Sequence, residues 1–194
     1  MRRRLLAQLR SQISDRRVLE AVAAVPRDRF VPAGLAKSAW DNIPLPIGCE
    51  QTISQPLVVA RMCEVLRLQG DERILDVGTG SGYHAAILAR LGAHVWSIER
   101  HPELSREAAR HLADVPNVTL LVGDGALGLP GEAPFDAINV AASATTIPPA
   151  LTDQLAVGGR LVLPVGEQLV VVERTPSGLQ HQSLERVRFV PLVT

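Results

Sequence analysis

Short apolar runs alternate with amphipathic segments through the middle of the chain. The apolar runs predict five buried strands, at residues 73–77, 94–98, 118–122, 135–141 and 160–165. Helical spacing of the apolar positions predicts helices at residues 82–91, 102–113 and 148–155. Strands and helices that alternate in this way predict a parallel sheet with helices on both faces.

Two apolar runs near the end of the chain have no helical segment between them. They predict strands at residues 168–174 and 180–190, on either side of the turn Pro176-Ser177-Gly178. We expect both strands to add antiparallel to an edge of the sheet. The predicted fold class is therefore α/β, Rossmann-like and doubly wound, with a mostly parallel sheet and antiparallel C-terminal edge strands.

The first 70 residues predict helices around a long irregular stretch. Apolar positions at helical spacing predict two helices within residues 2–24, the second after the capping pair Ser14-Asp15. A third helix is predicted from Pro56 to about Gly70. Residues 26–55, between these helices, hold four prolines and two glycines. Loops of that length in a compact domain are usually functional or disordered.

Composition places the chain among ordinary folded proteins. It has 194 residues, of which 46% are hydrophobic and 21% charged, and this suits one domain with a real core. We expect a single domain over residues 1–194. Its parts are an N-terminal helical segment (1–70), an α/β core (71–165) and C-terminal strands (166–194).

Charge and cysteine content limit the partners and metals that the chain is expected to bind. The 20 basic and 20 acidic residues give zero net charge, so no nucleic-acid partner is expected. No apolar segment reaches about 18 residues, so no membrane contact is expected either. Cys49 and Cys63 do not have the spacing of a zinc motif, and two residues cannot complete such a site. We expect plain thiols, no metal, and a cytoplasmic monomer.

The strongest chemical feature is the glycine-rich segment Gly78-Thr79-Gly80-Ser81-Gly82, which follows a predicted strand and opens a helix. Its glycines allow a sharp turn and a close approach of the backbone to a ligand. The dinucleotide fingerprint GxGxxG needs its third glycine where Tyr83 stands, and no Lys-Ser/Thr pair follows as in a P-loop. The spacing resembles that of the S-adenosyl-L-methionine-dependent methyltransferases.

Three acidic residues lie near the ends of the first three predicted strands, where they can lie beside this loop. Glu99 ends the second predicted strand, where a carboxylate can accept hydrogen bonds from both hydroxyls of a ribose. Asp124, followed by Gly125, comes after the third strand and can accept from an adenine amino group. Asp76 lies near the end of the first strand and can reach the amino group of the ligand through water or the loop backbone. The alternatives are a solvent-exposed acid at Glu99, a plain turn at Asp124 and a helix N-terminal charge at Asp76.

Motifs from about Val18 to Val193 resemble the protein-L-isoaspartate O-methyltransferase family, in that family's order and spacing. The segments most particular to the family are Gln51–Pro56 and the C-terminal Phe189-Val190-Pro191-Leu192. The resemblance implies transfer of a methyl group from S-adenosyl-L-methionine to the free carboxylate of an L-isoaspartyl residue in a damaged protein or peptide. The methyl ester then closes to a succinimide, whose hydrolysis returns some normal aspartate.

The resemblance also assigns roles to residues. Ser54 matches the active-site serine of the family, and its hydroxyl would orient the acceptor carboxylate, which needs no general base because it is already ionised at neutral pH. The alternative is that Ser54 only caps the following helix. Thr52 would line the cofactor side. The acceptor would be bordered by Gln51, Ile53, Asn139, Ala141 and Ala142.

Three positions depart from the usual bacterial pattern of the family. Glu50 stands where glycine is usual, Ala141 where threonine is usual, and Leu57 where tyrosine is common. A negative charge at Glu50, next to the substrate entry, motivates a second hypothesis, a related O-methyltransferase that acts on a carboxylate of one specific peptide or protein. A third hypothesis is a cofactor-binding scaffold or a nucleic-acid partner without methyl transfer, against which the zero net charge and Ser54 argue.

Overall fold

Seven strands form one sheet in the order β5-β4-β3-β6-β7-β8-β9, and two more form a separate hairpin in the computed structural model, which describes residues 1–193. The strands are β1 Leu45–Gly48, β2 Gln51–Ile53, β3 Arg73–Val77, β4 His94–Glu99, β5 Val118–Val122, β6 Phe135–Val140, β7 Leu155–Val165, β8 Gln168–Thr175 and β9 Gly178–Arg186. The helices are α1 Arg2–Arg10, α2 Arg16–Ala24, α3 Pro56–Leu66, α4 Tyr83–Leu88, α5 Pro102–His111 and α6 Pro149–Asp153. Three short 3₁₀ helices complete the chain, at η1 Arg27–Phe30, η2 Ala33–Leu35 and η3 Gly125–Leu127.

The sheet has the predicted topology. Strands β3 to β7 pair in parallel, and β8 and β9 add antiparallel at one edge. From β3 the chain first builds outward through β4 and β5, and then returns to place β6 on the other side of β3. In open α/β sheets such a reversal leaves a crevice at the carboxyl ends of the strands, where ligands bind.

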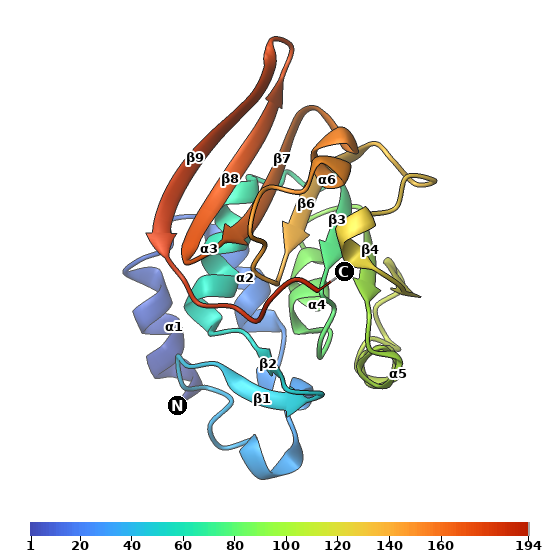
Figure 1. Cartoon of the computed structure of the whole chain (residues 1–194). Helices are drawn as coiled ribbons and strands as arrows, with labels where there is room; N and C mark the ends of the chain where they lie inside the picture. The colour runs from blue at the N-terminus through green and yellow to red at the C-terminus, as the bar shows by residue number, and fades with distance from the viewer. Residues whose placement is uncertain (194) are drawn as a thin grey trace.

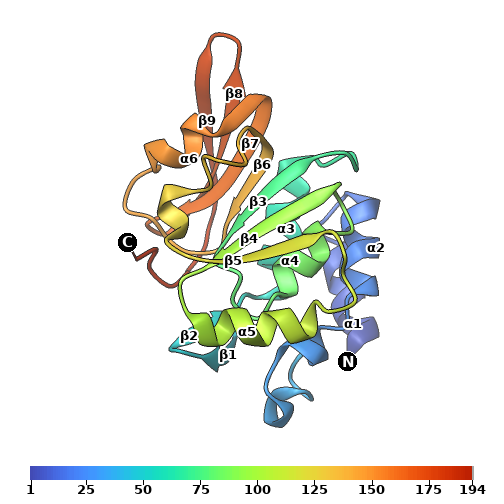
Figure 2. The same cartoon turned by 90° about the vertical axis from the view of Figure 1, so that its right-hand side faces the viewer.

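Alternation along the central strands divides the core between the two faces of the sheet. In β3, Ile74 belongs to the apolar cluster that the helices α1 to α5 cover, whereas Leu75 and Val77 belong to the cluster on the opposite face, beside α6. Figure 2 shows α2, α3 and α4 on one side of the strands and α6 on the other. Asp76 therefore points to the same face as Ile74, toward α4, because side chains alternate along a strand.

The N-terminal helices pack on this same side. Asp15 caps α2 by accepting hydrogen bonds from the amides of Arg17 and Val18, which confirms the capping role predicted for the pair Ser14-Asp15. Leu5 and Leu9 of α1 belong to the main apolar cluster. Within residues 1–193, no helix is both long and apolar enough to cross a membrane.

The irregular stretch predicted for residues 26–55 contains more structure than expected. Two 3₁₀ helices begin it, and the β1–β2 hairpin ends it. Pro44 and Pro46 argued against strands here, because proline removes a ladder donor. The hairpin has only two strands, so each strand has one edge without a partner. Strand β1 can therefore accommodate Pro46.

Two strand boundaries also differ from the prediction. β7 begins at Leu155 rather than residue 160, because Gly158 and Gly159 lie in an irregularity of the β6–β7 register and not in a loop. A Cβ atom on Gly159 would lie 2.9 Å from the carbonyl oxygen of Asp136, so only glycine fits there. β9 ends at Arg186 rather than residue 190, and the chain then leaves the sheet.

The segment after β9, residues 187–193, is called the C-terminal tail below. It runs back across the end of the sheet, close to the β1–β2 hairpin (Figure 1). The amide of Ser143 donates to the carbonyl of Val190, and the amide of Leu192 donates to the carbonyl of Ser143, both at 2.8 Å. The tail is thereby fixed beside the loop that follows β6.

Candidate functional site

A cavity of about 340 Å³ lies at the carboxyl ends of β3 and β4, in the crevice that the topology predicts. Its volume is within the range of small-molecule and cofactor sites. The glycine loop forms its floor, the β1–β2 hairpin one wall and the C-terminal tail another. These three segments, which are far apart in the sequence, therefore meet in this main cavity.

Most of the predicted site residues line the main cavity. Those that do are Gln51, Thr52, Ile53, Ser54, Gly78, Thr79, Gly80, Glu99, Gly125, Ala141 and Ala142. Residues that were not predicted as site residues also line it, and they are Cys49, Val59, Val77, Ser81, Tyr83, His84, Ile98, Arg100, His101 and the tail residues Val190, Pro191, Leu192 and Val193.

Four predicted residues lie outside the lining. Asp76 and Asn139 are fully buried beneath the loop, where each faces protein and not the cavity. Gly82 has φ +87° and packs on α5, since a Cβ atom there would lie 3.0 Å from Leu112 Cδ1. Asp124 caps η3 by accepting a hydrogen bond from Ala126 N at 2.9 Å, while its neighbour Gly125 reaches the cavity.

Glu99 is held rigidly at the cavity wall. It is only 5% exposed, and its two carboxylate oxygens accept backbone hydrogen bonds from Gly80 N at 2.8 Å and His101 N at 2.9 Å. Each oxygen keeps a further lone pair, because a carboxylate offers about four acceptor sites. Glu99 is thus a fixed acceptor for a ligand that brings two donors, and not a solvent-exposed acid.

Four of the five amides of the loop Gly78–Gly82 are already hydrogen-bonded within the protein. Gly78 N and Thr79 N donate to the carbonyl of Ile98. Gly80 N donates to Glu99, and Gly82 N donates to the carbonyl of Thr79. Loops that bind phosphate instead leave their amides free for the anion. With these donors used and a carboxylate beside them, the loop is built for a ligand without phosphate.

A second cavity of about 450 Å³ adjoins the main one, and we call it the groove. Thr52, Ser54, Ala141 and Val190 line both spaces, so they form the wall between them. The N-cap of α3 is Gln55, whose side chain makes no capping hydrogen bond, and the first-turn amide of Leu57 donates instead to Asn42 Oδ1 at 3.0 Å. Ser54 is therefore not a helix cap, and it lies where the two spaces meet.

A family model described as Protein-L-isoaspartate(D-aspartate) O-methyltransferase matches residues 1–194. The chain belongs to this family. It is 54% identical over 187 residues to Protein-L-isoaspartate O-methyltransferase 1 of Syntrophobacter fumaroxidans, which covers 93% of the chain and 87% of that protein. It is 53% identical over 196 residues to the Protein-L-isoaspartate O-methyltransferase of Aeromonas hydrophila, with 98% and 96% covered.

Solved structures agree with this family. A protein-L-isoaspartate O-methyltransferase superposes with a TM-score of 0.88 at 26% identity, over 100% of this chain and 66% of that longer chain. A putative protein-L-isoaspartate O-methyltransferase from Plasmodium falciparum, in complex with S-adenosyl-L-homocysteine, superposes with a TM-score of 0.85 at 26% identity. In that case the match covers 99% of this chain and 98% of the other.

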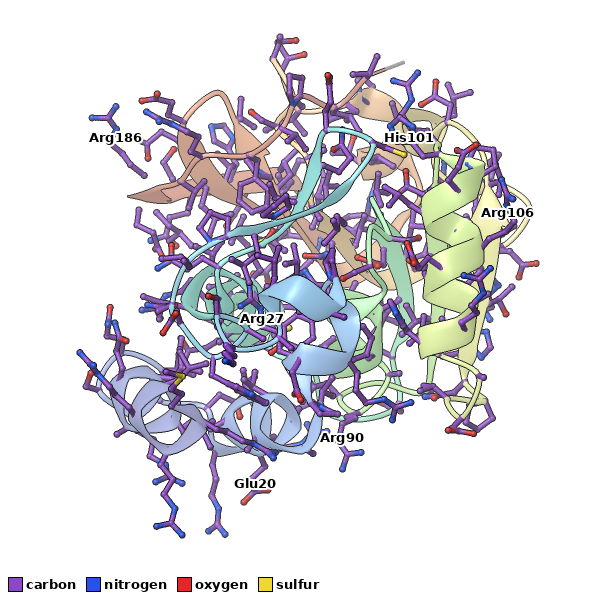
Figure 3. The ribbon with its side chains drawn as sticks, turned by 90° about the horizontal axis from the view of Figure 1, so that it is seen from below. Glu20, Arg27, Arg90, His101, Arg106 and Arg186 are labelled. Carbon is purple, nitrogen blue, oxygen red and sulfur yellow. The ribbon has the colours of Figure 1, made fainter. Side chains whose placement is uncertain are left out.

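The isoaspartate methyltransferase site depends on Arg27, which the sequence reasoning did not single out. Its side chain is 0% exposed and donates to the carbonyl oxygens of Ala39, Ile43 and Ser54, at 2.6, 3.0 and 3.1 Å. Figure 3 shows Arg27 in the interior, beside the 3₁₀ helix that carries it. Burial lowers the pKa of this guanidinium to about 10, so it stays charged at neutral pH. It fixes the backbone of Ser54.

A chain of buried polar side chains supports the loop from below. Asp76 accepts hydrogen bonds from Ser97 Oγ and Asn139 Nδ2, both at 2.7 Å, and Thr79 Oγ1 lies 2.7 Å from Ser97 Oγ. Burial raises the pKa of Asp76 to about 6, against the effect of these two hydrogen bonds. At neutral pH the carboxylate is mostly ionised and holds the neighbouring donors in place.

His84 ends this chain on the α4 side. Asn139 Nδ2 has two hydrogens, so after donating one to Asp76 it can donate the other to His84 Nδ1, at 3.2 Å. His84 then carries its proton on Nε2, which lies 3.4 Å from the buried thiol of Cys63. Burial lowers the pKa of His84 to about 3, so the ring is neutral.

Replacing Arg27 by methionine should destabilise the fold and impair the site together. One buried and two partly buried carbonyl groups would lose their donor, so we expect the free energy of unfolding to fall by about 3 kcal/mol. Urea unfolding measures this loss. The matched control is Arg29→Met, on the same 3₁₀ helix but exposed. Equal losses in the two variants would contradict the role of Arg27.

Replacing His84 by glutamine should reduce acid sensitivity. The unfolded chain protonates His84 near pH 6.5 but the folded chain only near pH 3, so its contribution to stability is lost as pH falls below 6.5. At pH 5 this loss is about 2 kcal/mol. Asp76 has the opposite sign, since its folded-state pKa is raised, but it is common to both proteins.

Unfolding free energies of the wild type and of His84→Gln at pH 7.5 and pH 5.0 test this prediction. The wild type should lose more stability between the two pH values than the variant does. His181→Gln, on the exposed strand β9, is the control and should follow the wild type. Parallel curves for the wild type and His84→Gln would show that the buried ring does not carry this pH dependence.

Proposed function

We propose that this chain transfers a methyl group from S-adenosyl-L-methionine to the free carboxylate of L-isoaspartyl residues in damaged proteins and peptides, which starts their repair through a succinimide. Relatives more than half identical over most of the chain are named for this activity. The single observation that carries the proposal is the main cavity itself, whose glycine loop uses four of its five amides within the protein and whose wall presents Glu99.

The residues of the main cavity fit S-adenosyl-L-methionine. The ligand has no phosphate, and its ribose offers two hydroxyl donors that match the remaining lone pairs of Glu99. We assign Gly78, Thr79 and Gly80 to contacts between the backbone of the glycine loop and the cofactor. We assign Gly125 and Asp124 to contacts with the adenine end of the cofactor. When bound, this cofactor supplies an electrophilic methyl group on a positively charged sulfur.

Asp76 has a different role in this proposal from the one its position in the sequence suggested. Its oxygens are occupied by Ser97 and Asn139, so it does not bind the cofactor directly. It instead fixes Thr79 through Ser97, and it places a buried negative charge beneath a site that accepts a cation. Asn139 likewise acts from beneath the site and not as a border of the acceptor.

Ser54 orients the acceptor in this proposal. An isoaspartyl carboxylate, with an ordinary pKa near 4, is already a nucleophile at neutral pH and needs no general base. Ser54 lies in the wall between groove and main cavity, so a carboxylate that arrives from the groove meets its hydroxyl at the point of transfer. Gln51, Thr52 and Ile53 build the same wall from β2.

Small residues and the C-terminal tail complete the surroundings of the acceptor. Ala141 and Ala142 leave room for a peptide backbone at the end of β6. The tail covers the cavity from the opposite side and reduces its contact with water. A dry site favours the reaction, because it joins a negative oxygen to a cationic methyl donor and leaves two neutral products.

The competing hypothesis of an acceptor on one specific peptide was motivated by Glu50. This residue lies at the turn of the β1–β2 hairpin and lines the main cavity, whereas the groove is lined by other residues. Its charge therefore does not face the surface on which a peptide would lie. General isoaspartyl repair is the function that the geometry supports best. The monomeric state and the cytoplasmic location stay predictions.

Paired peptides test the proposal. One carries an L-isoaspartyl residue and the other an aspartyl residue in the same sequence, and each is incubated with S-adenosyl-L-methionine labelled in its methyl group. We expect base-labile label on the isoaspartyl peptide alone. Binding of S-adenosyl-L-homocysteine without any methyl ester on either peptide would remove isoaspartate as the acceptor.

Ser54→Ala should lower kcat by about 10- to 100-fold, because the acceptor loses the group that aligns it. The affinity for S-adenosyl-L-homocysteine, measured by calorimetry, should stay unchanged, since Ser54 orients the acceptor and not the cofactor. A variant with unchanged kcat would show that Ser54 has no part in transfer.

Glu99→Gln should have the complementary effect. Loss of charge-assisted hydrogen bonds should weaken binding of S-adenosyl-L-homocysteine by about 10- to 100-fold in the same calorimetric measurement. At saturating cofactor, kcat should recover most of its wild-type value, because Glu99 is remote from the acceptor side. Unchanged cofactor affinity would contradict the assignment of Glu99.

A further inference from the structure

The groove beside Ser54 has charged residues at one end only. Its lining contains three of them, Glu167 after β7, Arg186 at the end of β9, and Arg188 in the C-terminal tail, and the rest of the lining is apolar or uncharged. Their formal charges sum to +1. Arg186 projects outward at the rim of the molecule (Figure 3).

Arg186 and Arg188 are not equivalent. Arg186 forms an ion pair with Glu167, so the charges of these two largely cancel. Arg188 is exposed and, among residues 1–193, forms no ion pair within 4 Å. It still lies near Glu167, whose pKa is lowered by the hydrogen bond from Arg186 first and by the charge of Arg188 as well. Arg188 is therefore the source of the net positive charge of the groove.

The groove shares its wall with the main cavity at the residue that orients the acceptor. A peptide whose isoaspartyl carboxylate reaches Ser54 from this side must lay its neighbouring residues along the groove, between Val58 on α3 and the tail. The two acidic residues near the site, Glu50 and Glu99, line the main cavity instead. The peptide therefore meets a surface of positive sign.

We propose that Arg188 makes the groove selective for isoaspartyl peptides that carry an acidic residue close to the isoaspartate. This inference rests on the proposed function and adds a preference within its substrate class. The attraction acts on peptide binding, so it changes Kd and KM and leaves kcat nearly constant. Because the charge is exposed, salt screens it, and the Debye length falls from about 10 Å at 0.1 M to about 3 Å at 1 M.

The experiment compares isoaspartyl peptides of one sequence that carry Glu, Gln or Lys two residues before or two residues after the isoaspartate. Fluorescein-labelled versions report Kd by anisotropy on the enzyme loaded with S-adenosyl-L-homocysteine, and methyl transfer reports KM and kcat. At low salt we expect the Glu peptide at the favoured position to bind about two- to five-fold more tightly than the Lys peptide. The difference should disappear at 1 M NaCl.

Variants separate Arg188 from general charge effects. Arg188→Gln should abolish the preference and Arg188→Glu should reverse it. Glu167→Gln, which releases Arg186 from its ion pair, should enlarge it. Arg110→Gln, exposed on α5 and outside the lining of both spaces, is the matched control and should leave it unchanged.

Equal Kd values for the Glu and Lys peptides at both positions, or no measurable binding of any of them, would overturn the inference, as would a preference that survives Arg188→Glu. Failure of the proposed function gives a different result. In that case no peptide acquires a methyl ester, while anisotropy still ranks the peptides by charge.

Discussion

A buried cation without a carboxylate partner holds the acceptor side of this protein together. Arg27 donates to three carbonyl oxygens, from Ala39, Ile43 and Ser54, and these belong to a stretch with few regular backbone hydrogen bonds of its own. Desolvation of a guanidinium is unfavourable, and charge-assisted hydrogen bonds with well-defined geometry offset it. The planar fork of arginine can reach three acceptors, which the compact ammonium group of lysine serves less well. This contact fixes the backbone of Ser54, while Leu45, Ile47 and Ile53 anchor the β1–β2 hairpin in the main apolar cluster.

The glycine loop shows how similar sequence patterns lead to different ligands. A phosphate-binding loop directs free amides at an anion, whereas this loop returns its amides to Ile98, Glu99 and Thr79. The same hydrogen bond from Gly80 that removes a phosphate donor also orients Glu99. Beneath the loop, Asp76 and His84 take part in one polar chain, and burial moves their pKa values in opposite directions. The sheet thus supports its ligand through buried polar contacts as well as through shape.

The sequence predicts the sheet well because each central strand is a short apolar run bounded by glycine or polar residues. It also predicts Glu99 and the loop, since both follow strand ends. The direction of a polar side chain at a strand end is harder to predict. The side chain of Asp76 points to the face of the sheet that α4 covers rather than toward the cavity. This direction depends on the register of β3 within the sheet. Arg27 has the sequence context of an ordinary surface arginine, and its three carbonyl partners come from residues 12 to 27 positions away. The wall formed by the C-terminal tail was indicated only by resemblance to the family, because Val190 and Leu192 carry no chemical signal.

The pairing of Ser143 with the C-terminal tail links completion of the site to the order of protein synthesis. Val190 and Leu192 are made nearly fifty residues after Ser143, so at about 5 to 20 residues per second a ribosome needs roughly 2 to 10 s to add them. During that interval the glycine loop, Glu99 and Ser54 already exist, but the crevice above them lacks one wall. Strands β7, β8 and β9 are also made in this interval, so the nascent chain has an open crevice beside an incomplete sheet. Val190 and Leu192 close it by pairing with Ser143, so removing the segment that holds them should affect the site far more than its size suggests.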